Sequence, residues 1–64
     1  MKLHEIPKGS KIRYATLMHG TEIIVTFKHL DGIYSYCEAN TGETVYLSVN
    51  TPLEKGEDGI YEIV

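Results

Sequence analysis

Four side chains of this sequence carry imidazole or thiol groups, which bind transition metals or act as nucleophiles in many proteins. They are His4, His19, His29 and Cys37. Their separations of 15, 10 and 8 residues match neither the Cys-x-x-Cys nor the His-x₃₋₅-His spacing of zinc sites. His19 and His29 would also end one expected strand about 30 Å apart, at ~3.3 Å per residue. We therefore expect solvated histidines, no metal and no cofactor.

Cys37 and His29 form the one pair that could support nucleophilic catalysis. Both would lie on paired strands beside the Asp31–Gly32 turn. An activated thiol needs a lowered pKa and a third group that orients the base. A convex hairpin offers no cleft for a substrate, so we expect Cys37 to be a small buried thiol.

The adjacent carboxylates Glu57 and Asp58 lie in a polar stretch with glycines on either side. Catalytic carboxylates need rigid placement and environments that separate their pKa values. Gly56 and Gly59 lack the strand–helix context of a phosphate-binding loop. The sequence thus indicates no catalytic residues, and we expect a protein that is not an enzyme.

These groups would be positioned by a central β-hairpin over residues 22–38. Asp31-Gly32 separates two runs rich in β-branched and aromatic residues, a pattern typical of a tight hairpin turn. In the first run alternation directs Ile23, Val25 and Phe27 to the core. In the second run either face could be buried, and we favour Tyr34 and Tyr36 as partly buried rings with hydrated hydroxyls.

Shorter segments of alternating hydrophobicity surround the hairpin. Strands are expected at 2–6, 11–18, 43–49 and 60–64, with a 3₁₀ turn at 50–53. The residues expected to face the core are Leu3, Ile12, Tyr14, Thr16, Met18, Val45, Leu47, Val49 and Leu53. The last strand must pair with the sheet to bury Ile60, Tyr61 or Ile63. No segment has the apolar period of a helix.

The pattern predicts one all-β domain over residues 1–64, a small barrel of five or six antiparallel strands. In strand number and spacing it resembles the SH3-like small barrels. It lacks tryptophan and an Ala-Leu-Tyr-Asp-Tyr-like segment, so the resemblance does not imply binding of proline-rich peptides. The stretch Phe27-Lys28-His29-Leu30-Asp31-Gly32-Ile33-Tyr34-Ser35-Tyr36-Cys37 resembles small accessory proteins of bacteriophages. That likeness implies a regulator that binds and blocks a host component.

The composition of the chain indicates the cellular compartment in which we expect the protein. A single cysteine excludes an intramolecular disulfide and suits a reducing compartment. No apolar run approaches the roughly 20 residues needed to span a membrane, and residues 1–5 lack the apolar stretch of a signal peptide. We expect a cytoplasmic protein, located in the host cytoplasm if a phage encodes it, with no membrane partner.

Tyrosines on adjacent strands suggest two kinds of binding. Next to the basic residues Lys11, Arg13 and Lys28, the rings could stack on single-stranded nucleic acid or a nucleotide. The net charge of −3 argues against this use.

The preferred interpretation is contact with protein. If Ile12 and Val25 fill the core, Leu17 and Ile24 point outward as an apolar patch. The expected contact residues are Leu17, Ile24, Tyr34, Tyr36 and Tyr46, with Lys11, Arg13 and Lys28 as a charged rim. The partner would be a second copy, which would form a homo-oligomer, or a larger protein. A third alternative, which the sequence does not decide, is an oligomer that encloses a small-molecule pocket between its subunits.

Overall fold

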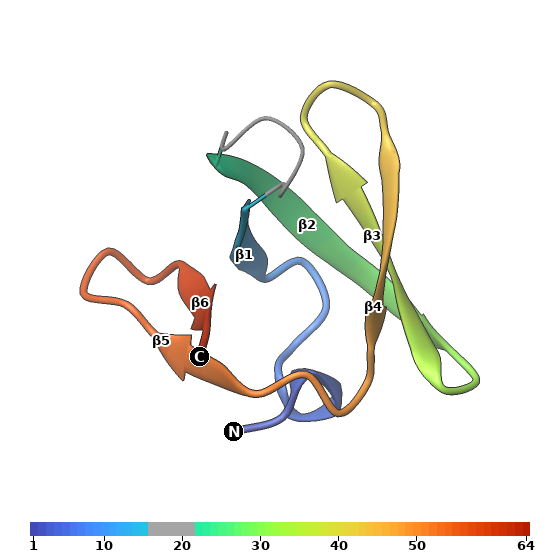
Figure 1. Ribbon diagram of the computed structural model, residues 1–64, viewed down its shortest axis with the longest axis horizontal. Coiled ribbons are helices and arrows are strands. Elements are labelled where there is room, and N and C mark those ends of the chain that lie inside the picture. The colour runs from blue at the N-terminus through green and yellow to red at the C-terminus, as the bar shows by residue number, and fades with distance from the viewer. Residues whose placement is uncertain (16–21) are drawn as a thin grey trace.

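The computed structural model describes residues 1–15 and 22–64 (Figure 1). The described residues form a 3₁₀ helix η1 (Leu3–Glu5) and six strands: β1 (Lys11–Ala15), β2 (Glu22–Asp31), β3 (Tyr34–Ala39), β4 (Thr44–Ser48), β5 (Leu53–Lys55) and β6 (Tyr61–Ile63). The strands form one sheet in the order β4-β3-β2-β1-β6-β5. The predicted β class and strand number are confirmed for the described residues. The predictions for Thr16, Leu17, Met18 and His19 lie outside them.

The predicted closed, wholly antiparallel barrel is wrong. The sheet order ends at β4 and β5, and β1 pairs with β6 in parallel, with Ile12 opposite Tyr61. Figure 1 shows β2, β3 and β4 side by side, while the β5–β6 hairpin lies on the other side of β1. Alternation within a strand fixes its faces but not the direction of its partner, so this pairing could not be read from the sequence.

The central hairpin has the predicted turn but an unpredicted bulge. Gly32 has a φ of 64°, the positive value expected for glycine in such a turn. The register of β2 with β3 shifts between Phe27 and His29, so Lys28 is the extra residue of a β-bulge. Simple alternation would direct His29 inward with Phe27. The bulge instead places it opposite Tyr36, on the outer face.

The core lies between the inner face of the curved sheet and the segment around η1. Its buried residues are Leu3, Ile6, Ile12, Val25, Phe27, Cys37, Ala39, Leu47, Leu53 and Tyr61, with Tyr14, Ile23 and Val45 partly buried against them. This confirms most of the predicted inward face. Among the three candidates in the last strand, Tyr61 is the buried one.

The preference for the tyrosine face of β3 as the inner one is wrong: Tyr34 is exposed, and only Tyr36 is partly buried. The inner face of β3 carries Ser35, Cys37 and Ala39, all buried. Large neighbours explain this choice, because Phe27 lies opposite Cys37 and Leu47 lies opposite Ser35. The space between two large side chains fits small ones. The Ser35 hydroxyl is satisfied because it donates a 2.9 Å hydrogen bond to the carbonyl oxygen of Leu47.

The positions of the 3₁₀ turn and the first strand are also corrected. Residues 3–5 are the 3₁₀ helix, not part of a strand, because the Glu5 carboxylate accepts a 2.6 Å bond from the Lys2 N–H and closes the turn. Residues 50–53 are not helical. The Leu3 N–H donates to the carbonyl of Thr51 at 3.0 Å, and Leu53 begins β5 with its side chain in the core.

Candidate binding surface

Three rings form a continuous row across the outer face of β2, β3 and β4. Tyr36 lies opposite His29 on one side and opposite Tyr46 on the other. The His29 and Tyr36 rings are stacked, with centroids 5.0 Å apart and planes within 8°. Tyr36 and Tyr46 meet edge to face, at 5.9 Å and 79°. We call His29, Tyr36 and Tyr46 the ring row.

Much of this aromatic surface remains accessible. Tyr46 is 58% exposed, and Tyr34, two residues before Tyr36 on the same face of β3, is 50% exposed. Tyr36 is half-buried between its two neighbours. Offset and edge-to-face packing leaves ring faces open on the outside of the row. These rings can therefore accept further apolar or stacking contacts.

The structure thus brings together Tyr34, Tyr36 and Tyr46, three of the predicted contact residues. Ile24 lies on the same outer face but is half-buried, opposite Arg13 on β1. The prediction for Leu17 lies outside the described residues. His29, which the structure adds to the row, was not among the predicted residues, because only the bulge at Lys28 turns its ring outward and nothing in the local pattern marks a bulge.

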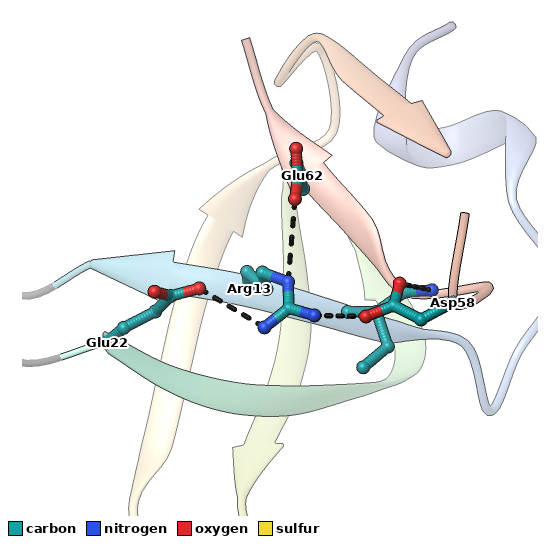
Figure 2. A network of polar contacts seen from close by, with 5 residues as sticks. Arg13, Glu22, Asp58 and Glu62 are labelled. Carbon is teal, nitrogen blue, oxygen red and sulfur yellow. Dashed lines mark hydrogen bonds and ion pairs between the residues drawn. The ribbon is translucent and has the colours of Figure 1, made fainter. Parts of the chain in front are cut away.

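The predicted charged rim divides into two parts. The Lys11 ammonium donates a 2.6 Å bond to the hydroxyl of Thr26, and Lys28 is exposed at the bulge. Arg13 is instead held by three carboxylates (Figure 2). Its guanidinium lies 3.4 Å from Glu22 and 3.5 Å from Glu62, and it also contacts Asp58.

A tight turn supplies the Asp58 carboxylate. Its Oδ1 accepts a 3.0 Å bond from the Ile60 N–H. That bond, and then the positive charge of Arg13, lower the pKa of Asp58 below its ordinary value. In turn, Asp58 is the main cause of a raised pKa at Arg13. A Cβ at Gly56 would lie 2.8 Å from the carbonyl oxygen of Ile60, so this turn requires glycine there.

Arg13, Glu22 and Glu62 line a shallow pocket of about 400 Å³ together with Tyr14 and Ile63. Its charged groups already bind one another. In residues 1–15 and 22–64, no buried side-chain nitrogen or oxygen lacks a hydrogen-bond partner. The charged side chains that line this pocket are therefore paired with one another.

The residues considered for metal binding and catalysis are placed apart. Within the described part of the chain, no three His, Cys, Asp or Glu side chains gather in a way that could hold a metal ion. Cys37 is buried on the inner face, where desolvation raises the pKa of its thiol, whereas His29 lies on the outer face. The sheet itself separates these two groups. None of the described helical residues forms a helix long and apolar enough to cross a bilayer.

Comparison of the chain with protein-family models, with curated proteins and with solved structures gave no match.

Proposed function

We propose that this protein is a non-enzymatic binding module that contacts protein, including further copies of itself, through the ring row and Tyr34. The observation that carries the proposal is the packing of three partly exposed rings side by side on a hydrogen-bonded ladder. Tyrosine suits such surfaces because it offers a large contact area at a low cost in side-chain entropy.

The charges around the rings favour protein over nucleic acid. Nucleic-acid affinity depends on several cations that neutralise phosphates. Arg13 is occupied by three carboxylates, and Lys11 donates to Thr26. Asp31 and Glu38 lie on the same face as the rings, in register with Tyr34 and Thr26. This distribution would repel a phosphate backbone.

Single-stranded nucleic acid is the second candidate, favoured by the stacked pair His29–Tyr36 with Lys28 next to it. A base stacked on an aromatic side chain contributes about 1–3 kcal/mol in known single-strand binders. One exposed lysine beside two rings supports this use less well than the apolar row supports protein contact.

The biological role that we attach to the module is that of a small cytoplasmic regulator that docks on a larger protein. The resemblance of residues 27–37 to bacteriophage accessory proteins supports this part of the proposal. Of the features behind the SH3-like resemblance, the open sheet has one, the run of consecutive antiparallel strands β1–β4.

Sedimentation equilibrium and an oligonucleotide titration separate the two candidates. We expect self-association that changes little with moderate salt and weakens about tenfold, or ~1.4 kcal/mol, when Tyr46 is replaced by alanine. Glu57→Ala, in an exposed turn away from the rings, is the matched control. Oligothymidylate should not change the tyrosine fluorescence. Association that ignores Tyr46→Ala, or steeply salt-dependent oligonucleotide binding, would refute the proposal.

A further inference from the structure

The two edges of the sheet differ in how they are protected. Exposed strand edges tend to pair with other chains, and short length, charges and proline prevent this pairing. β5 has all three protective features: it is three residues long, follows Pro52, and carries Glu54 and Lys55. β4 is five residues long and reads Thr-Val-Tyr-Leu-Ser, with no charge and no proline. β4 is therefore the edge suited to pairing.

The hydrogen bonds of the β3–β4 ladder show which peptide groups of β4 face outward. The Ala39 N–H donates to the Glu43 carbonyl at 2.8 Å, and the Val49 N–H donates to the Ile33 carbonyl at 3.0 Å. In an antiparallel ladder such pairs recur at every second residue. The odd-numbered residues of β4 thus bond to β3, and the peptide groups of Thr44, Tyr46 and Ser48 point away from the sheet.

This outward edge is self-complementary. If two β4 strands pair antiparallel about a two-fold axis at Tyr46, each Thr44 lies opposite Ser48 of the other copy. Reciprocal N–H to C=O bonds then form between the two Tyr46 residues, and the Ser48 N–H of each copy donates to the Thr44 carbonyl of the other. In the monomer the Ser48 carbonyl already accepts bonds from the Thr51 N–H at 3.0 Å and from the Thr51 hydroxyl at 2.6 Å, so the Ser48 group that the edge offers is its N–H.

The side chains on the outer face fit the same arrangement. Directly opposite residues in an antiparallel pair have Cβ atoms about 5 Å apart, so the two Tyr46 rings would touch. The ring row of one copy would then continue into that of the other, giving six rings in series. No charged side chain lies on either β4 strand to oppose the pairing.

We propose that two copies of this chain pair antiparallel along β4, with Tyr46 at the two-fold axis. The inference rests on the proposed function and goes further, because it names the partner as a second copy and the seam as one strand edge. The pair makes one continuous sheet of twelve strands, counting the six that each chain has in its described residues. The protected β5 edges then end this sheet on both sides.

A pair of double variants tests the edge and its register together. In Thr44→Lys/Ser48→Lys, every lysine faces a lysine of the other copy, and like charges directly opposite destabilise a strand pair. In Thr44→Lys/Ser48→Glu, each lysine faces a glutamate instead. By sedimentation equilibrium we expect the first variant to raise the dimer dissociation constant at least about tenfold and the second to remain near the parent value.

Circular dichroism checks that both variants keep the β fold. If the lysine variants fail to fold, a synthetic chain with an N-methyl group on Tyr46 replaces them. That group removes an outward donor and leaves the bonds to β3 intact, and we expect it to yield monomers.

The outcomes separate this inference from the proposed function. An unchanged mass for both double variants, equal loss in both, or a monomer in the parent protein would overturn pairing along β4. If Tyr36→Ala weakens association while the double variants do not, the ring surface stands and the edge pairing is wrong. If Thr44→Lys/Ser48→Lys weakens association while Thr44→Lys/Ser48→Glu and Tyr36→Ala do not, the edge pairing stands and the ring surface is wrong.

Discussion

The outer face of the sheet has two halves that use their exposed groups differently. Around β1 and β6, Arg13 binds Glu22, Asp58 and Glu62, so the charges have partners within the molecule (Figure 2). Around β3 and β4 the rings contact one another along edges and faces, and Tyr46 stays 58% exposed. The comparison teaches that exposure alone does not mark a binding surface. The proposed binding surface is the half whose exposed rings keep open faces, not the half whose charges are paired with one another.

Neither half determines whether the chain folds. Exposed ion pairs contribute little to stability and are screened by salt, and cross-strand ring pairs contribute about 0.2–1 kcal/mol each. The two halves share the core beneath them, where Ile12, Val25 and Phe27 are buried in neighbouring strands. The first prediction below alters this shared core, and the next two alter the ring half around β3 and β4 and the ionic half around Arg13.

The largest effect is expected from Phe27→Ala. The change leaves a cavity under β2 and should cost about 3–5 kcal/mol. At ~0.05–0.15 kcal/mol per residue, a chain of 64 residues has a total stability of about 3–10 kcal/mol. We therefore expect a largely unfolded or strongly destabilised protein in urea titrations. Ile33→Ala, at a side chain 72% exposed beside the hairpin turn, should change little. A loss below about 1 kcal/mol for Phe27→Ala would contradict the described core.

The second prediction breaks the aromatic half at its centre. Tyr36→Ala removes the ring that contacts both His29 and Tyr46. We expect a loss of about 1 kcal/mol in unfolding free energy and a roughly tenfold weaker self-association. Urea titration and sedimentation equilibrium measure the two effects. Equal association of variant and parent would show that the ring row is structural only.

The third prediction breaks the ionic half. Arg13→Met removes three ion pairs and keeps an apolar stem of similar length. Because these pairs are exposed, we expect a smaller fall in the thermal midpoint than for Tyr36→Ala, and the fall should shrink at high salt. Self-association should match the parent. A weakened association would mean that the two halves do not act separately.

The smallest effect is a pH dependence at Asp58. Its pKa is lowered in the folded protein from an ordinary value of 3.8, so its contribution to stability is present above that value. The contribution is lost as the pH falls through the folded-state pKa. The thermal midpoint of the parent should exceed that of Asp58→Asn at neutral pH, and the gap should narrow below about pH 4. A gap that widens with acid would have the wrong sign for this carboxylate.

The sequence correctly predicted the features that depend on neighbouring residues alone, namely the buried face of most strands and the position of the hairpin turn. Alternation correctly directed Val25 and Leu47 inward, and Asp31-Gly32 correctly marked the turn. The three tyrosines could be grouped because adjacent strands were predicted in the right order. These predictions needed only the side-chain period of a strand and the conformational freedom of Gly32.

The remaining features depend on contacts between distant segments. Whether β3 buries its tyrosines or its small residues depends on the size of Phe27 and Leu47 across the ladder. The bulge that turns His29 outward and the parallel pairing of β6 with β1 leave no local pattern. The three partners of Arg13 come from β2, β6 and the turn between β5 and β6, so their convergence needs the whole topology.

The most direct measurement is an isotope-filtered NOE experiment on an equal mixture of labelled and unlabelled chains. It detects only protons that are close across two different molecules. We predict intermolecular cross-peaks from the backbone and ring protons of Tyr46, and between Thr44 of one chain and Ser48 of the other. Intermolecular cross-peaks confined to β5 or to the residues around Arg13 would contradict pairing along β4. The absence of any such cross-peak at millimolar concentration would also contradict it.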